Sequence, residues 1–155
     1  MNADTKRKVF FSFHYENDLW RVNQVRNMGV LSDDQIVQAN RLEEIEKEGD
    51  AAIKKWIEEK MRPCSCVAVL VGSQTASSKW VKYEIEQAIE SSKGLFGFYI
   101  HELKDNEGKT SDKGINPLPS EYKCHDQDLS HSDDSAYDWI KKNLSDWVED
   151  AIDEQ

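Results

Sequence analysis

Apolar residues along the chain gather into short unbroken runs that alternate with segments of helical periodicity. Three runs of strand length, rich in β-branched and aromatic residues, cover residues 9–13, 66–72 and 94–100. Since apolar residues are nearly continuous in each run, the pattern is typical of strands covered on both faces of a parallel sheet. Residues 30–41 are less regular, and we expect a loop there with one short strand. Residues 121–124 are a candidate edge strand.

The segments between these runs place apolar residues three and four positions apart, which predicts amphipathic helices. We expect helices over residues 18–28, 42–61, 79–91 and 135–153. Asn17 or Asp18 is the expected N-cap of the first helix, and a Ser-x-x-Asp pattern at Ser135 predicts the start of the last. Gly49 costs the second helix about 1 kcal/mol of propensity, so we expect that segment to be kinked or to form two helices.

The alternation of strands and helices predicts an α/β fold with a doubly wound parallel sheet of four to five strands. A length of 155 residues suits a single domain, residues 1–155. Within it we expect a core over residues 7–100, a long variable polar connection over 101–134, and the C-terminal helix over 135–153. A connection of that length is typical of functional or mobile loops.

The composition narrows the classes of partner. A formal net charge of −10 disfavours binding to nucleic acid and to anionic membranes, because both are polyanions. The chain has three cysteines, Cys64, Cys66 and Cys124. Their number and spacing match neither a secreted disulfide framework nor a zinc finger. The polar N-terminus differs from a signal peptide, and no apolar run approaches the ~18 residues that span a bilayer. We therefore expect a cytoplasmic protein.

Several motifs of common enzyme classes are missing from the sequence. It contains no HExxH zinc motif, no phosphate-binding P-loop and no glycine-rich dinucleotide fingerprint after the first strand. We therefore expect no bound metal, no ATP hydrolysis and no dehydrogenase of the Rossmann type.

Polar side chains follow the first apolar run, where the predicted strand ends and a helix begins. Ser12 and His14 lie at the strand end, and Asp18, Arg21 and Arg26 follow in the helix. Ligands of open α/β sheets bind at the carboxyl ends of the strands, so these residues are candidates for a binding site. The two arginines cannot share one helix face cleanly, so we expect at most one to contact a ligand phosphate and the other to form an ion pair. The alternative is a capped helix with solvated polar residues.

A second candidate site is the helix that follows residues 66–72. Trp80 and Glu84 are one helical turn apart, beside an expected inward stripe of Val81, Ile85, Ala88 and Ile89. A carboxylate next to an indole at a ligand crevice can have a shifted pKa or stabilise a cationic transition state. The alternative is a solvated glutamate, as we expect for Glu86 and Glu90. The remaining histidines, His101, His125 and His131, are expected at the surface.

Taken together, these segments carry a resemblance to a known family. The sequence reads VFFSFHY at 9–15, RVNQVRN at 21–27, VGSQT at 71–75 and KWVKYEI at 79–85. In this order they resemble the TIR-like proteins of the bacterial Thoeris antiphage system, a group related to general TIR domains. The resemblance covers roughly residues 7–100.

The resemblance implies a flavodoxin-like fold and cleavage of NAD at the bond between nicotinamide and ribose. Thoeris members rejoin the ADP-ribose into a cyclic isomer that activates a partner effector protein. By residue, Glu84 corresponds to the catalytic glutamate of TIR enzymes, within the pattern Trp80-x-x-x-Glu84. The strand-end motif that lines the nucleotide pocket corresponds to Ser12, Phe13 and His14. Further substrate-binding candidates in or beside these motifs are Asp18, Arg21, Ser73, Trp80 and Tyr83.

This interpretation makes NAD the substrate and needs no cofactor. The expected partners are NAD and an effector activated by the nucleotide product, and self-association is left open. The chief alternative is a non-catalytic TIR-like module that binds a protein or a nucleotide. A phosphoacceptor receiver domain shares the fold, but it needs an Asp where Gly72 and Ser73 stand.

Overall fold

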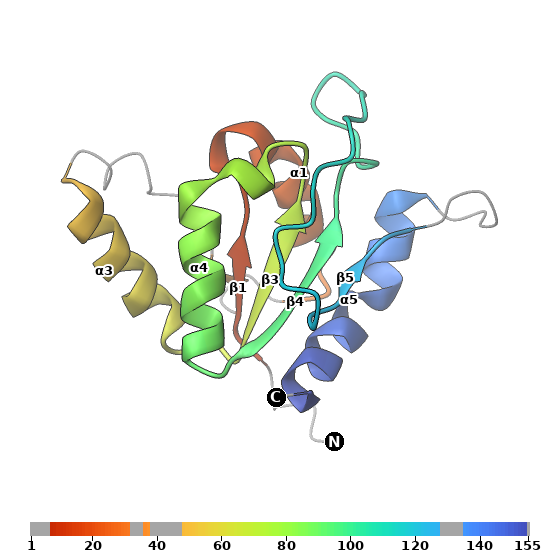
Figure 1. The fold of residues 1–155 in the computed structure, drawn as a ribbon. Helices are drawn as coiled ribbons and strands as arrows, with labels where there is room; N and C mark the ends of the chain where they lie inside the picture. Colours follow the sequence, from red (N-terminus) through yellow and green to blue (C-terminus); the bar gives the residue numbers. More distant parts are fainter. Residues whose placement is uncertain (1–6, 32–35, 38–47, 128–134, 155) are drawn as a thin grey trace.

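Five parallel strands form the centre of the fold, in the order β2-β1-β3-β4-β5 (Figure 1). The strands are β1 (Val9–Ser12), β2 (Ile36–Val37), β3 (Cys66–Val71), β4 (Gly94–Tyr99) and β5 (Cys124–His125). This computed structural model describes residues 7–31, 36–37, 48–127 and 135–154. The strand order is that of the flavodoxin-like doubly wound sheet, which confirms the predicted fold class.

Helices cover both faces of the sheet. They are α1 (Tyr15–Asn27), α3 (Asp50–Met61), α4 (Lys79–Glu90) and α5 (Ala136–Asp153), with a short 3-10 turn, η2 (Thr75–Ser77), before α4. Helices α1 and α5 pack on one face of the sheet, and α3 and α4 pack on the other. The C-terminal edge of the central strands therefore lies between α1 on one side and α4 on the other, as expected for a ligand crevice.

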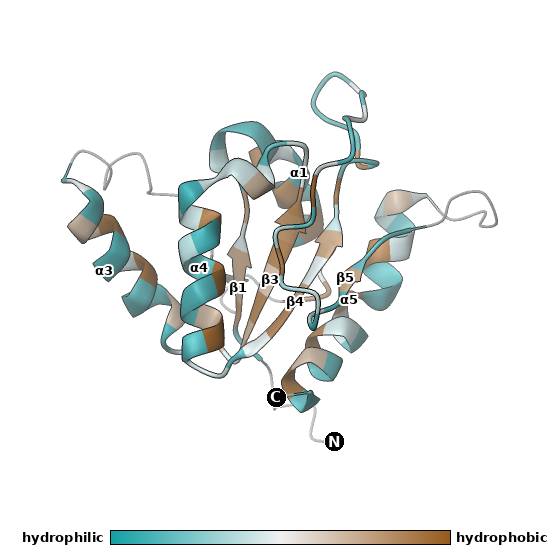
Figure 2. Ribbon diagram, viewed as in Figure 1, coloured by the Kyte–Doolittle hydropathy of each residue, from teal (hydrophilic) through white to brown (hydrophobic). Residues whose placement is uncertain are grey.

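The unbroken apolar runs are explained by two hydrophobic cores. Along β3, Cys66, Ala68 and Leu70 face the core beneath α1 and α5, whereas Val67, Val69 and Val71 face the core beneath α3 and α4. All six residues of this strand are buried. Figure 2 shows hydrophobic residues concentrated along the central strands, with hydrophilic residues on the outer faces of the helices. Because side chains alternate between the faces of a strand, a strand buried on both faces needs apolar residues throughout.

The starts of two helices differ from the prediction. Helix α1 begins at Tyr15, and His14, rather than Asn17 or Asp18, is its N-cap: its Nδ1 atom accepts a hydrogen bond from the Asn17 amide. The residue first expected to cap the helix, Asp18, is therefore inside it and completely buried. Helix α3 begins after Gly49, whose φ of 96° is incompatible with a continuous helix, and residues 42–47 lie outside the described residues.

Three predictions about side-chain exposure are wrong. Ile89, expected on the inward stripe of α4, is 40% exposed, because the buried face of the helix consists of Val81, Glu84, Ile85 and Ala88. His101, expected at the surface, is buried beneath the segment that follows β4, where its carbonyl accepts the Ser111 amide. The predicted surface position of His125 is also wrong, since this half-buried ring stacks on Trp147 of α5. His131 lies outside the described residues.

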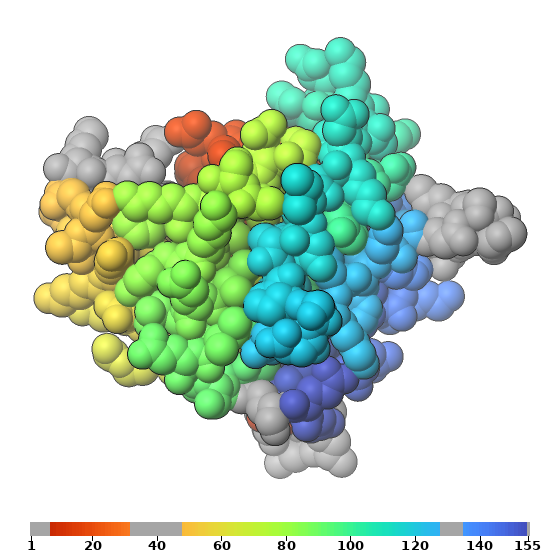
Figure 3. Space-filling model, viewed as in Figure 1, coloured from red at the N-terminus to blue at the C-terminus, as the bar shows by residue number. Residues whose placement is uncertain are grey.

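The connection after β4 returns across the carboxyl ends of the strands before it joins β5. Its Leu118 side chain packs into the core of α3 and α4, and in the space-filling view this segment lies against the surface of α4 (Figure 3). Strand β5 pairs with Gly97 and Phe98 at the sheet edge, so the predicted edge strand exists but is shifted to Cys124–His125.

None of the helices in the described residues combines the length and apolar composition that crossing a bilayer requires.

Candidate active site

A buried hydrogen bond joins the end of β1 to α4. Ser12 Oγ donates to Glu84 Oε1 at 2.7 Å, and Ser12 is completely buried while Glu84 is 4% exposed. Helix α4 brings Glu84 to β1 because its apolar residues Val81, Ile85 and Ala88 pack against the sheet on the same helix face. Glu84 is therefore a carboxyl group within the core-facing surface of the helix, rather than a solvated residue beside it.

Burial raises the pKa of Glu84 to about 8, from an ordinary value of 4.5. Its hydrogen bond from Ser12 favours the charged form but offsets only part of the cost of removing the carboxylate from water. At neutral pH the unliganded protein therefore holds a proton on Glu84. A nearby positive charge would favour release of that proton, because it stabilises the carboxylate.

Glu84 lies at the wall of a cavity of about 290 Å³, which we call the Glu84 cavity. The cavity lies between the end of β1, the first turn of α1 and the start of α4. Residues that line it include Phe11, Phe13, His14, Tyr15, Trp80 and Glu84. The structure thus brings together four of the residues proposed from the sequence, namely Phe13, His14, Trp80 and Glu84, with Ser12 bound to Glu84.

The predicted substrate contact Tyr83 faces elsewhere and does not line the Glu84 cavity. Its ring lies 5.4 Å from Lys54 Nζ of α3 and makes an edge contact with Trp80, with ring centroids 6.1 Å apart. One residue along a helix changes direction by about 100°, so Glu84 and Tyr83 cannot both face the same crevice. Tyr83 therefore belongs to the contact between α3 and α4.

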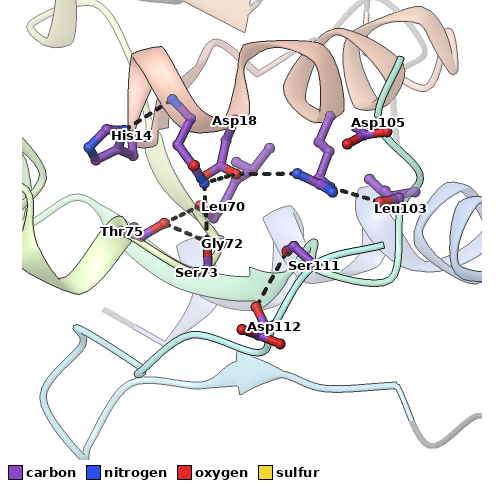
Figure 4. A network of polar contacts seen from close by, with 12 residues as sticks. His14, Asp18, Leu70, Gly72, Ser73, Thr75, Leu103, Asp105, Ser111 and Asp112 are labelled. Carbon is purple, nitrogen blue, oxygen red and sulfur yellow. Dashed lines mark hydrogen bonds and ion pairs between the residues drawn. The ribbon is translucent and has the colours of Figure 1, made fainter. Parts of the chain in front are cut away.

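Three more predicted residues, Asp18, Arg21 and Ser73, form a separate polar network on the other side of the first turn of α1 (Figure 4). Asn17 connects them: its Nδ2 donates to Asp18 Oδ1 at 3.0 Å and to Ser73 Oγ at 3.3 Å. Asp18 Oδ1 is 3.9 Å from an Arg21 guanidinium nitrogen. Burial raises the pKa of Asp18, while Asn17 and Arg21 act in the opposite direction.

Arg21 connects α1 to the segment that follows β4. Its Nε donates to the Leu103 carbonyl at 2.7 Å and its Nη2 donates to the Lys109 carbonyl at 3.0 Å. Arg21 is 5% exposed, and its guanidinium contacts two backbone carbonyls and the Asp18 carboxylate. Of the two roles expected for an arginine of this helix, Arg21 therefore has the ion pair. Arg21 therefore holds the segment 103–109 against the helix.

A larger cavity of about 520 Å³ lies between α1 and this segment, and we call it the Trp20 cavity. Residues that line it include Asn17, Trp20, Arg21, Asn23, Ser73 and Lys109. Two of its lining residues, Arg21 and Ser73, were predicted to bind substrate. The cavity itself was not predictable from the sequence, because five of its twelve lining residues come from a polar connection without a recognisable motif. A further signal was Trp20, a large aromatic residue that falls outside the buried stripe of α1 and is 56% exposed.

Two glycines allow the backbone segments at the crevice to approach each other closely. A Cβ atom on Gly72 would overlap the carboxylate of Asp18, and one on Gly114 would overlap the carbonyl oxygen of Gly72. The end of β3 therefore lies between a buried carboxyl group of α1 and the returning chain. This packing requires glycine at both positions.

Comparison with known proteins identifies the family of the chain. The family model of the Thoeris protein ThsB, TIR-like domain, matches residues 10–105, from β1 to the segment beyond β4. The chain belongs to this family. The match to the ThsB family includes all of the residues proposed for the site from the sequence.

The chain is also similar to a protein of Bacillus cereus (strain MSX-D12) with the name "Putative cyclic ADP-D-ribose synthase ThsB1". The two are 38% identical over 117 residues, which cover 72% of this chain and 61% of the relative. This ThsB-family chain therefore spans less than two thirds of the length of that relative.

We expect Arg21→Gln to lower the free energy of unfolding by about 2 kcal/mol, because the carbonyls of Leu103 and Lys109 lose buried donors. Denaturant unfolding measures this change, and amide hydrogen exchange of residues 103–109 should accelerate. The control is Lys104→Gln, which removes one positive charge from an exposed position of the same segment. Equal stability of the two variants would show that Arg21 does not hold the segment.

We expect the unfolding free energy of the native protein to fall, relative to Glu84→Gln, as the pH rises from 4.5 to 8. A raised pKa means that between these pH values the folded state keeps a proton on Glu84 that the unfolded chain has lost. The stabilisation that this proton contributes is therefore fully present below pH 4.5 and is lost as the pH rises towards 8. The difference in unfolding free energy between the native protein and Glu84→Gln should change by at most about 1.4 kcal/mol per pH unit. Glu86→Gln, at an exposed position of the same helix, should show no such difference. A constant difference between native protein and Glu84→Gln would contradict the buried, protonated state.

Proposed function

We propose that this chain cleaves NAD at the bond between nicotinamide and ribose, with Glu84 as the carboxylate that faces the reacting ribose. The observation that carries the proposal is the buried Ser12–Glu84 pair at the wall of a cavity at the C-terminal edge of the sheet. Family membership supports it, as does the name of the Bacillus cereus relative, a cyclic ADP-D-ribose synthase.

The chemistry of the reaction explains why one carboxylate suffices. Nicotinamide in NAD is a positively charged ring, and when its bond to the ribose breaks, the electron pair neutralises the ring nitrogen. The leaving group therefore needs no proton, and no acid is required. Positive charge passes to the ribosyl centre, where an anionic Glu84 stabilises it.

The protonated state of free Glu84 fits this sequence of events. The cavity is preorganised around a neutral carboxyl group, held by Ser12, and entry of a cationic nicotinamide ring favours loss of its proton. The carboxylate is then buried in the wall of the cavity, where its attraction to the ribosyl cation is stronger than in water. Binding of substrate and charging of the catalytic group are thus coupled.

His14 and Trp80 are two further side chains that line the Glu84 cavity. His14 Nδ1 accepts the hydrogen bond from the Asn17 amide, which leaves Nε2 as the ring nitrogen that can donate to a bound substrate. The indole of Trp80 offers a flat apolar surface beside Glu84, and Lys79 Nζ lies 4.8 Å from its ring centroid. A planar nicotinamide ring suits such a surface.

For the product, we propose a cyclic ADP-ribose isomer. After nicotinamide leaves, the ribosyl cation is captured by a nucleophilic atom of the same ADP-ribose, and the new bond closes the ring. The proposed role is a signal in antiphage defence that activates a partner effector protein. The name of the Bacillus cereus relative supports the cyclisation step, and the Thoeris family supports the defence role.

We expect the purified protein to release nicotinamide from NAD, and Glu84→Gln to lower the rate at least about 100-fold, because the transition state loses its anion. Chromatography of nicotinamide and of the nucleotide product measures both. The matched control is Glu86→Gln, which removes a solvated carboxylate from the same helix and should keep native activity. Release that is unchanged by Glu84→Gln would refute the assignment, and no release under any condition would favour the non-catalytic alternative.

We also expect kcat/KM for NAD to rise about tenfold per pH unit below pH 8 and to level off above it. The active form has an ionised Glu84, and the pKa of about 8 in the free protein sets the position of the rise. The corresponding rise in kcat should lie at lower pH, since the bound cation favours the carboxylate. A kcat/KM that stays constant between pH 6 and 8 would contradict this account.

A further inference from the structure

The Glu84 cavity and the Trp20 cavity are neighbours on either side of the first turn of α1. Glu16 lines both of them. On the wall of the Trp20 cavity, next to Glu16 in the chain, Asn17 Nδ2 donates to Ser73 Oγ at 3.3 Å, which joins α1 to the end of β3. A ligand that extends from one cavity to the other would cross this bridge, past an amide and a hydroxyl that can both hydrogen-bond to it.

The size of the Glu84 cavity limits what it can hold. Its volume of about 290 Å³ is at the lower end of the ~300–1,000 Å³ typical of small-molecule sites. One aromatic ring with its ribose fits such a space, whereas a dinucleotide with two bases, two riboses and two phosphates does not. The other half of the substrate must therefore lie outside, and the Trp20 cavity, at about 520 Å³, shares a wall with the first.

The surface of the Trp20 cavity suits a nucleoside. Its wall includes the amides of Asn23 and Asn106, the hydroxyl of Thr110, and the carboxylate of Asp105. Such groups can hydrogen-bond to the edge of a base and to ribose hydroxyls. Hydrogen bonds from the Glu107 and Lys109 amides lower the pKa of Asp105, which keeps this carboxylate charged.

Trp20 adds a stacking surface at the same place. In the part of the chain that the structure describes, it is one of three large hydrophobic side chains that are exposed, with Ile89 and Ile115. Its indole is 56% exposed and lines a cavity whose other walls are mostly polar. An exposed indole beside hydrogen-bonding groups is the arrangement that proteins use to stack a base.

The cavity is also held in shape before any ligand enters. Arg21 donates to the carbonyls of Leu103 and Lys109, and Gln24 Nε2 donates to the carbonyl of Lys104. These bonds hold the outer wall of the cavity on α1, so a ligand does not bear the cost of ordering it.

We propose that the Trp20 cavity binds the adenosine half of the dinucleotide, with the adenine ring stacked on Trp20, while the nicotinamide ribosyl half lies against Glu84. This assignment rests on the proposed function and extends it by placing the part of the substrate that does not react. The diphosphate then crosses the first turn of α1 beside Asn17 and Ser73. Trp20 is a binding residue in this account, remote from the bond that breaks. This pose is that of bond cleavage, and the adenosine half must leave Trp20 and turn back towards the ribosyl centre before the ring closes.

Binding of AMP tests the adenosine site without any reaction, because AMP contains neither nicotinamide nor the scissile bond. Isothermal titration of the native protein and of Glu84→Gln should give the same affinity. Trp20→Ala should weaken binding about tenfold or more, and Trp20→Tyr, which keeps a stacking ring, should stay within about threefold of the native protein. An affinity for AMP that is unchanged in Trp20→Ala, or the absence of AMP binding to the native protein, would overturn the proposal.

A kinetic comparison separates this proposal from the proposed function. Nicotinamide mononucleotide has the scissile bond but lacks the adenosine half. Trp20→Ala should raise KM for NAD about tenfold with little change in kcat, and leave kcat/KM for nicotinamide mononucleotide unchanged. Equal losses with both substrates would overturn the adenosine assignment. If neither substrate is cleaved by any variant, the proposed function fails, while Trp20-dependent AMP binding would still identify the nucleotide site.

Discussion

Removing a carboxyl group from water at the end of β1 constrains the whole region around it. Glu84 is buried because α4 packs on the sheet through neighbouring apolar residues, and its carboxyl group accepts a hydrogen bond from Ser12. Such burial is costly for an anion but mild for a neutral carboxyl group, so the fold favours the protonated form. Because its surroundings disfavour the carboxylate, Glu84 is a group whose ionisation a nearby cation would strongly promote.

The other side of the crevice depends on a second polar network, in which hydrogen bonds join α1 to two distant parts of the chain. Asn17 reaches the end of β3 through Ser73, and Arg21 reaches the segment after β4 through two backbone carbonyls. The absence of a side chain at Gly72 leaves room for Asp18, and its absence at Gly114 lets the returning chain approach the backbone of Gly72. One helix therefore shapes the walls of two cavities, which places them next to each other at the carboxyl edge of the sheet.

Much of the fold was predictable because strands buried on both faces and amphipathic helices leave strong patterns. Strands β1, β3 and β4 and helix α5, with its Ser135 cap, were predicted to within a few residues. The N-cap was misassigned because histidine is not among the usual capping residues, although His14 Nδ1 fills the role. Ile89 was misassigned because Glu84, a charged residue, occupies the buried face that periodicity reserves for apolar residues.

The sequence by itself determined the α/β fold, the family and the stretch at 79–85 in which the candidate glutamate lies. These properties depend on local patterns, which a chain carries in its order of residues. Only the tertiary structure decided that Glu84 meets Ser12, that Tyr83 faces α3, and that Arg21 holds a loop more than eighty residues away. The Trp20 cavity was decided there too, because its walls come from segments that folding alone brings together.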